Sequence, residues 1–217
     1  MPHTALIVGN GPSVEQLASR KRSRPEADDV LVVGVNRVLA LAATWDLRFD
    51  ALLIRDTWRR LWDRPDLARR YHQLWQAHPA WKIGPADRRI TRCDQFVRFA
   101  DGWQDRVRAD SNGETAVIQA PSAVLAAANW AWLQGARRLL LVGVDYAGGY
   151  PRRLAPYDEQ TPGSAAQYDK PVREDIERAF AQARSAIEQA GGSIWNLSPE
   201  SRLKALARCD WSEVMGR

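Results

Sequence analysis

The chain has 217 residues, of which 45% are hydrophobic and 26% are charged, and these proportions exclude a largely disordered protein. The 31 basic residues, nearly all arginines, outnumber the 26 acidic ones and leave a net charge of +5. Two cysteines are too few for a disulfide framework. No apolar stretch approaches the roughly 20 residues of a membrane span, and no signal-peptide pattern is present. We therefore expect a reduced, cytoplasmic protein.

Short apolar runs that end in Gly, Asn or Asp recur along the chain. Continuous runs of Val, Ile and Leu are typical of strands buried on both faces of a sheet. The predicted strands are residues 5–8, 30–35, 51–54, 139–144 and 193–195, with shorter candidates at 96–99 and 117–119. The helical stretches between them are residues 14–19, 58–76, 123–134 and 173–190.

The alternation of strands and helices predicts an α/β fold, a Rossmann-like three-layer sandwich with a mainly parallel sheet. We expect residues 1–217 to form a single nucleotide-binding domain. Residues 148–171 contain glycines, prolines and tyrosines without periodicity, and we interpret them as a lid.

The first strand ends in the motif Gly9-Asn10-Gly11-Pro12-Ser13. Its glycines allow a tight turn and the close approach of a ligand, and Pro12 suits the first position of a helix. The N–H groups of such a helix start favour an anion such as phosphate. Val14 replaces the third glycine of a dinucleotide fingerprint, and no P-loop is present. A plain strand-to-helix turn is the alternative interpretation.

Three further strand ends carry polar residues. Asn36 is suited to bind a sugar or base edge, or to cap a helix. Asp56 is suited to bind a ribose hydroxyl, to hold Mg²⁺ through phosphate oxygens, or to cap a helix. The motif Gly143-Val144-Asp145-Tyr146 is a candidate contact for substrate or nucleotide sugar. Because ligands of parallel sheets bind at the carboxyl ends of strands, we expect these residues to converge.

The last predicted strand is followed by Asn196-Leu197-Ser198-Pro199-Glu200-Ser201. Ser198 is the predicted N-cap of a helix that begins at Pro199, and the free N–H groups of that helix suit a base or a phosphate. The three histidines are not at metal-ligand spacing with any carboxylate or thiol, so we predict no metal site from spacing.

In this order and spacing, the motifs resemble two related groups: the bacterial sialyltransferases of the Campylobacter type and the proteins similar to the archaeal 6-hydroxymethylpterin diphosphokinase. The resemblance is strongest over residues 1–13 and 121–203. It implies that Asn10, Asn36 and Ser122 contact the CMP-sugar donor. The predicted donor-binding residues are Gly9, Asn10, Gly11, Pro12, Ser13, Asn36, Asp56, Ser122, Gly143, Tyr146, Ser198 and Ser201.

The sialyltransferase lid carries a histidine as general base and tyrosines that stabilise the leaving phosphate. Here the lid has three tyrosines and no histidine. A lid carboxylate, Asp158, Glu159 or Asp169, would have to replace that base. Asp145 and Asp169 are therefore the predicted catalytic residues. In the diphosphokinase group the acidic strand ends bind metal, which implies a Mg²⁺ role for Asp56 and Asp145.

We predict a transferase that passes a group from a nucleotide-activated donor, most simply a CMP-type nucleotide sugar, to a hydroxyl acceptor. One alternative is a Mg²⁺-dependent diphosphokinase that binds ATP. Another is a non-catalytic module that binds a nucleotide or, through its arginines, nucleic acid. The arginines of residues 55–70 surround much of a predicted helix and alternate with Asp63 and Asp66, which favours a solvated helix over a nucleic-acid surface. The sequence is also compatible with a homo-oligomer.

Overall fold

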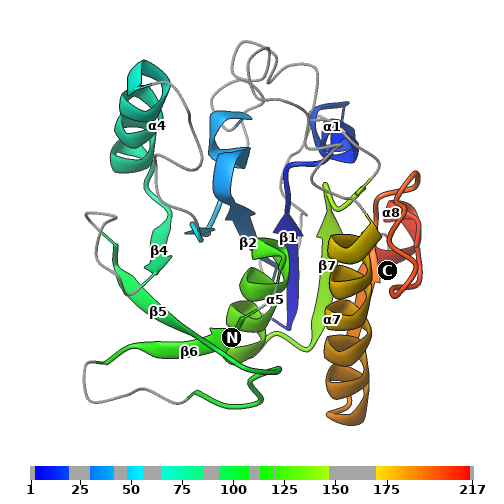
Figure 1. Ribbon diagram of the computed structural model, residues 1–217. Coiled ribbons are helices and arrows are strands. Elements are labelled where there is room, and N and C mark those ends of the chain that lie inside the picture. The colour runs from blue at the N-terminus through cyan, green and yellow to red at the C-terminus, as the bar shows by residue number, and fades with distance from the viewer. Residues whose placement is uncertain are drawn as a thin grey trace.

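The computed structural model describes residues 3–19, 30–41, 48–55, 65–85, 93–107, 113–119, 121–146 and 170–215. Within these ranges the strands form one eight-stranded sheet in the order β6-β5-β4-β3-β2-β1-β7-β8, and all neighbouring strands are parallel (Figure 1). The strands are β1 (Thr4–Val8), β2 (Val30–Val35), β3 (Ala51–Leu53), β4 (Trp81–Pro85), β5 (Gln95–Ala100), β6 (Thr115–Ile118), β7 (Arg138–Val142) and β8 (Ser193–Asn196).

The central strands are buried on both faces, as their continuous apolar runs predict. In β1, residues 5–8 are fully buried, with Ala5 and Ile7 in the core on one face and Leu6 and Val8 in the core on the other. Burying a side chain the size of Leu or Ile contributes about 1.5–3 kcal/mol relative to leaving it exposed. Both cores therefore stabilise the position of β1, which places the motif that follows it.

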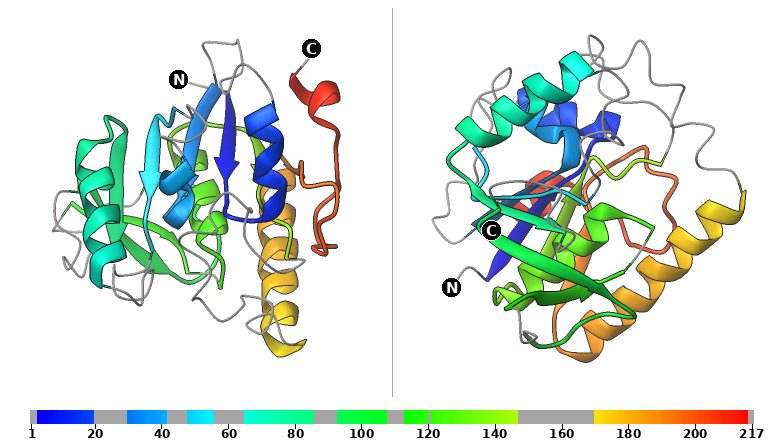
Figure 2. Two further views of the ribbon diagram at one scale, coloured as in Figure 1. Left: turned by 90° about the horizontal axis from the view of Figure 1, so that it is seen from above. Right: turned by 60° about the vertical axis from the view of Figure 1, so that its left-hand side comes forward.

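Helices cover both faces of the sheet (Figures 1 and 2). The helices α5 (Ala123–Leu133) and α7 (Lys170–Gln189) pack on one face. The short helices η1 (Pro12–Val14) and α1 (Glu15–Ser19), together with α4 (Pro65–Ala77), pack on the other. This arrangement confirms the predicted α/β class, a Rossmann-like three-layer sandwich, with a sheet that is wholly parallel among the described strands.

The sheet reverses its direction of growth at β1. From β1 the chain adds β2 to β6 outward on one side, and then returns through α5 to place β7 on the other side of β1. In open parallel sheets, ligands bind outside the carboxyl ends of the strands at such a reversal. The carboxyl ends of β2, β1 and β7 are therefore the place to look for a functional site.

Several sequence predictions need correction. Strand β4 was not predicted, because Lys82, Gly84 and Pro85 interrupt its apolar pattern. Strand β7 ends at Val142 rather than at residue 144, because Gly143 adopts a positive φ of 72°. No helix begins at Pro199; the Ser201 N–H instead donates to Ser198 O in a turn.

The C-terminal helix among the described residues is α8 (Trp211–Met215), which was not predicted. Residues 147–169, which include most of the predicted lid, lie outside the described ranges, as do Asp56, Asp158, Glu159 and Asp169. None of the helices within those ranges is long and apolar enough to cross a membrane.

Candidate functional site

The turns that follow β1 and β7 lie in direct contact. The Gly9 N–H donates to Val142 O and the Gly11 N–H donates to Gly143 O, both at 2.8 Å. A Cβ atom on Gly143 would lie 2.6 Å from Gly9 O, and one on Gly9 would lie 2.5 Å from Gly143 O. Glycine is therefore required at both positions because the two backbones approach too closely for any side chain.

Asp145 fills the space that the Gly11 turn leaves. Its Oδ2 accepts hydrogen bonds from Ser13 Oγ at 2.8 Å and from the Ser13 N–H at 3.2 Å. Asp145 is 3% exposed, and burial raises the pKa of its carboxyl group while the hydrogen bonds from Ser13 oppose the rise. The Ser13 N–H, predicted to be free for phosphate at the start of a helix, thus bonds to a carboxyl group of the chain itself.

Ser198, Ser201 and Asn196 extend these contacts beneath β7. The hydroxyl oxygens of Ser198 and Ser13 lie 2.7 Å apart and share a hydrogen bond, and Ser198 Oγ also accepts the Val144 N–H at 3.0 Å. Ser201 Oγ donates to Val144 O at 2.6 Å, and Asn196 Oδ1 accepts the Ser198 N–H at 3.0 Å.

All of these side chains except Ser13 are buried. We call the set the serine–aspartate network; its members are Ser13, Asp145, Asn196, Ser198 and Ser201. Because its polar atoms bond mainly to one another and to buried backbone groups, this network stabilises the junction of β1, β7 and β8. The predicted contacts of Ser13, Ser198 and Ser201 with a donor, and of Asp145 with an acceptor, stay predictions.

Two asparagines at the ends of β1 and β2 behave differently. Asn10 Nδ2 donates to Val35 O at 3.1 Å. Because a carbonyl oxygen can only accept hydrogen bonds, this contact also fixes which end of the Asn10 amide is the nitrogen. Asn10 Oδ1 is buried and has no hydrogen-bond partner in the described structure. A buried carbonyl without a partner costs about 1–3 kcal/mol, so this atom is an acceptor in need of a donor.

Asn36 directly follows the residue to which Asn10 bonds. Its Oδ1 accepts the Arg55 N–H at 3.1 Å, which ties the ends of β2 and β3 together. Its backbone has a positive φ of 51°, a conformation that is costly for most residues but tolerated by asparagine. We call Asn10 and Asn36 the amide pair. Backbone conformations of this kind recur where a side chain must face a ligand.

Ser122 and Tyr146 lie together on the α5 face of the same edge. Tyr146 Oη donates to Ser122 Oγ at 2.8 Å, and the Tyr146 ring packs edge-on against Phe180 of α7, with 6.3 Å between ring centroids. Tyr146 also has a positive φ, of 47°. Ser122 immediately precedes α5 but makes no capping hydrogen bond with its side chain, so its hydroxyl instead holds the tyrosine.

Arg55 lies at the same sheet edge, at the end of the third predicted strand, where the apolar run 51–54 placed it. It follows β3, and its guanidinium carbon lies 5.6 Å from the centroid of the Phe99 ring, near the end of β5. A guanidinium over an aromatic face keeps its positive charge.

The structure thus brings the predicted residues into three neighbouring groups along one sheet edge. Two predicted residues, Asp56 and Asp169, lie outside the described ranges. Within those ranges, no three His, Cys, Asp or Glu side chains lie close enough to hold a metal ion. The members placed together are Gly9, Asn10, Gly11, Pro12, Ser13, Asn36, Ser122, Gly143, Asp145, Tyr146, Ser198 and Ser201.

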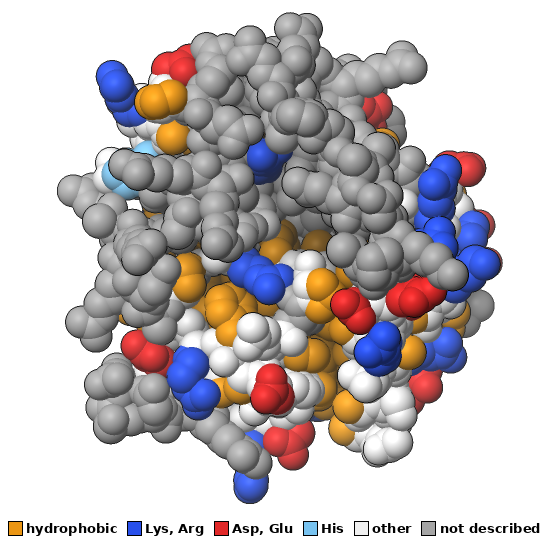
Figure 3. Space-filling view, in the orientation of Figure 1, with side chains coloured by type: hydrophobic (Ala, Val, Ile, Leu, Met, Phe, Trp, Pro, Cys, Tyr) orange, Lys and Arg blue, Asp and Glu red, His pale blue; other side chains and the backbone are white. Residues whose placement is uncertain are grey.

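Charges on the face that carries α5 and α7 are mixed. Figure 3 shows basic side chains interspersed with acidic ones, most densely toward α7, rather than gathered in one basic patch. On α7 the pairs Arg178–Asp175 and Arg184–Glu188 lie at 3.3 and 2.7 Å. On this face, much of the described basic charge is therefore balanced locally.

The fold and the polar edge define a Rossmann-like α/β protein. The chain is similar in structure to a MAf glycosyltransferase from Magnetospirillum magneticum AMB-1, with a TM-score of 0.62 and 13% sequence identity. The match covers 99% of this chain and 34% of that protein, so the chain spans about a third of its length. At this identity the likeness concerns the fold. No protein-family model and no curated protein sequence matches the chain.

Proposed function

We propose that this protein is a glycosyltransferase that binds a nucleotide-activated sugar, of the CMP-sugar type, at the carboxyl edge of β1 and β2. The observation that carries this proposal is Asn10 Oδ1, a buried acceptor without a hydrogen-bond partner in the described structure. The glycosyltransferase-like fold supports the same reaction class.

The amide pair suits a ligand that carries both hydrogen-bond donors and acceptors. The buried Asn10 Oδ1 lacks a donor and would accept from a hydroxyl or amine of the ligand, while Asn36 Oδ1 is already engaged by the Arg55 N–H, which leaves the Asn36 amide to donate. Ribose hydroxyls and the edge of a cytosine offer both kinds of group. A ligand that donates to Asn10 also recovers the cost of the unpaired carbonyl, which makes the interaction specific.

A positive charge for the phosphate comes from Arg55. Its backbone N–H donates to Asn36 Oδ1, while its guanidinium carbon lies 5.6 Å from the centroid of the Phe99 ring of β5, so the side chain extends along the same sheet edge on the side away from β1. Arginine binds phosphate oxygens through paired N–H donors. In this proposal Asn10 and Asn36 hold the nucleoside and Arg55 holds the phosphate that leaves with it.

Transfer of the sugar also requires a base that takes the proton from the acceptor hydroxyl. Asp145 is buried and bound by Ser13, so we assign it the positioning of the Gly11–Ser13 turn. We propose that the base comes from the lid at residues 148–171, with Asp169 as the candidate. Neither part of this assignment requires a metal ion, and we include Mg²⁺ in the test below.

The test is a thermal-shift panel of CMP, CMP-sialic acid, UDP-sugars, GDP-sugars and ATP, each with and without Mg²⁺. A ligand that binds only the native state raises the melting temperature by mass action. We expect CMP and a CMP-sugar to give the largest shift, and Asn10→Ala to abolish it. Gln189→Ala, which truncates an exposed amide at the end of α7, is the control and should keep the full shift.

Other outcomes would replace the proposal. A shift with ATP that depends on Mg²⁺ would indicate a diphosphokinase. Binding to polynucleotides that weakens steeply with salt would indicate a nucleic-acid-binding module. If no nucleotide at millimolar concentration raises the melting temperature, the protein is not a nucleotide-sugar transferase of the kind proposed.

A further inference from the structure

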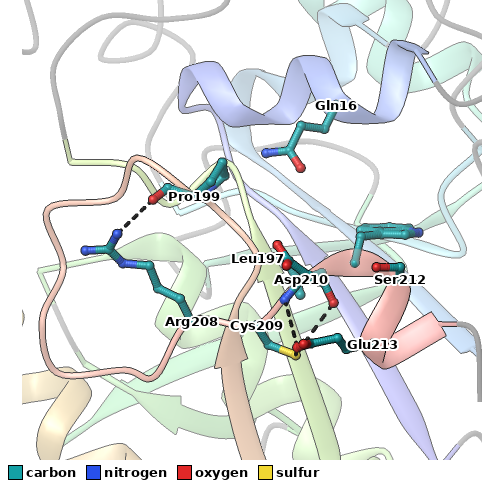
Figure 4. A pocket seen from close by; sticks show the side chains of 9 residues that line it. Gln16, Leu197, Pro199, Arg208, Cys209, Asp210, Ser212 and Glu213 are labelled. Atoms are coloured by element: carbon teal, nitrogen blue, oxygen red, sulfur yellow. Dashed lines mark hydrogen bonds between the residues drawn. The ribbon is translucent and has the colours of Figure 1, made fainter.

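A second concave site lies on the face opposite α5, where the chain after β8 packs back onto the sheet. The Asn196 N–H donates to Ala207 O at 3.0 Å and the Cys209 N–H donates to Asn196 O at 3.2 Å. These bonds hold residues 207–209 beside the end of β8. They fix one wall of a pocket whose other wall is α1 (Figure 4).

The pocket has a volume of about 450 Å³ and opens to solvent. Small-molecule sites in proteins typically measure roughly 300–1,000 Å³, so a single sugar ring fits. Figure 4 shows Gln16 reaching toward it from α1 and Ser212 and Glu213 contributed by α8. The lining residues are Gln16, Leu197, Pro199, Arg208, Cys209, Asp210, Trp211, Ser212 and Glu213.

Internal hydrogen bonds make the rim of this pocket rigid. Arg208 Nη1 donates to Pro199 O at 2.8 Å, which joins the two chain segments that form the rim. Glu213 Oε2 accepts the Asp210 N–H at 3.4 Å and the Cys209 thiol at 3.2 Å. A pre-formed pocket loses less conformational entropy when a ligand binds.

Several polar atoms of the lining remain available to a ligand. Among the described residues, none donates a hydrogen bond to the Asp210 carboxylate or to Glu213 Oε1, and none bonds to the Ser212 hydroxyl. Carboxylate oxygens accept hydrogen bonds, so the exposed side chains of Asp210 and Glu213 suit a ligand rich in donors. Two carboxylates against the single guanidinium of Arg208 disfavour phosphate and other anions.

The apolar part of the lining further narrows the class of ligand that the pocket suits. Trp211 packs partly buried against the core on this face, beside the buried Leu197. An indole presents a flat apolar surface, which suits the C–H face of a pyranose ring, while the hydroxyls at the ring edge reach carboxylates. An indole in one pocket lining with two exposed carboxylates and a hydroxyl therefore matches a neutral polyhydroxylated ring. We propose that the pocket between α1 and α8 binds a neutral saccharide.

The pocket also adjoins the candidate active site. Leu197 and Pro199 flank Ser198, whose hydroxyl belongs to the serine–aspartate network. Both sites thus lie at the carboxyl edge of the sheet, on either side of that network. The inference that the bound saccharide is part of the acceptor rests on the proposed function. The inference that the pocket binds a saccharide is independent of that function.

The test is ¹⁹F NMR of protein labelled with 5-fluorotryptophan, titrated with glucose, galactose, mannose, N-acetylglucosamine and N-acetylgalactosamine. The chain has ten tryptophans, and the resonance of Trp211 is the one lost in Trp211→Phe. We expect at least one of these sugars to shift the Trp211 resonance at millimolar concentration. The resonance of Trp81, which is 51% exposed at the start of β4, is the internal control and should stay in place.

Two variants locate the binding. Trp211→Ala should weaken the binding of the sugar by about tenfold or more, because it removes the flat surface on which the ring packs. Asp210→Asn, which keeps the shape and removes the charge, should weaken it several-fold even if the alanine variant folds poorly. Trp81→Ala, a matched removal of an exposed indole, should leave the affinity unchanged.

Three results would overturn the proposal. They are a Trp211 resonance that none of the five sugars moves, an affinity that both Trp211→Ala and Asp210→Asn retain, and a Trp211 resonance that inorganic phosphate or CMP moves instead. In the Asn10→Ala variant, the Trp211 resonance should still move when the sugar is added. Failure of nucleotide binding and failure of saccharide binding are therefore detected separately.

Discussion

The serine–aspartate network and the amide pair lie at the same sheet edge and use similar polar residues, yet they differ in how completely their atoms are bonded. In the network, Ser13, Ser198 and Ser201 bond to one another or to buried backbone groups. In the amide pair, Asn10 Oδ1 has no partner in the described structure. Saturated polar groups stabilise a fold, whereas an unsatisfied buried group is one that a ligand can complete.

The largest effect expected from the network side comes from Gly143→Ala. The new Cβ would lie 2.6 Å from Gly9 O in a backbone with φ of 72°, so the turns after β1 and β7 must separate. We expect a loss of about 3 kcal/mol or more in the free energy of unfolding, measured by urea denaturation.

Gly102→Ala is the matched control for this change. Gly102 has almost the same φ, of 71°, but nothing lies within 4 Å of its Cβ position. Its loss should be limited to the backbone strain, about 1 kcal/mol. Equal losses in the two variants would show that the close approach of the two turns does not matter to stability.

Ser198→Ala tests whether the network is structural. The change leaves the buried Val144 N–H without its acceptor and removes the bond to Ser13, which should cost about 1–3 kcal/mol of unfolding free energy. The nucleotide-induced thermal shift should be retained. A stable Ser198→Ala variant that has lost nucleotide binding would contradict a purely structural role for the network. It would indicate that Ser198 contacts the nucleotide-activated donor.

Asn36 allows backbone strain and side-chain function to be separated. At φ of 51°, Asn36→Gly should be more stable than Asn36→Ala by about 1 kcal/mol, because only glycine adopts this conformation without cost. Both variants should lose the nucleotide-induced shift, measured in the same thermal titrations. Retention of that shift in Asn36→Gly would mean that the turn, and not the amide, holds the ligand.

The smallest expected effect is a pH dependence from Asp145. Burial raises its pKa above the ordinary value of 3.8, so the folded state holds this proton more readily than the unfolded state. The resulting stabilisation is present below the unfolded pKa and is lost as pH rises through the folded pKa. The unfolding free energy of the wild type, measured against Asp145→Asn, should therefore fall from pH 4 toward neutrality. A difference that rises with pH would contradict the direction of the pKa change.

The sequence predicted the buried strands and the fold class because a strand covered on both faces needs a continuous apolar run. It missed β4, which carries Lys82 and Pro85, because the position of that strand depends on its neighbours β3 and β5. It predicted a helix that begins at Pro199, because a Ser-Pro pair is typical of a helix start. The hydroxyl is instead bonded to Val144 N and Ser13, contacts that only the tertiary structure provides.

The positions of the candidate residues follow from the sequence more directly than the contacts of each side chain do. Strand ends must converge in a parallel sheet, so the positions of Asn10, Asn36 and Gly143 follow from the pattern. Whether each polar atom bonds to the chain or remains open depends on contacts across long separations, such as Ser13 with Asp145. A single sequence does not contain those pairings, and it gave no sign that Asp210 and Trp211 line a pocket with Gln16.

The central place of β1 also constrains the order of folding. Its partners are β2, a few dozen residues away, and β7, whose residues 138–142 emerge from the ribosome long after residues 4–8. Until then one edge of β1 presents unpaired N–H and C=O groups along an apolar strand, which is a template for aggregation. The nascent chain therefore completes the protection of this buried strand only after β7 has been synthesised.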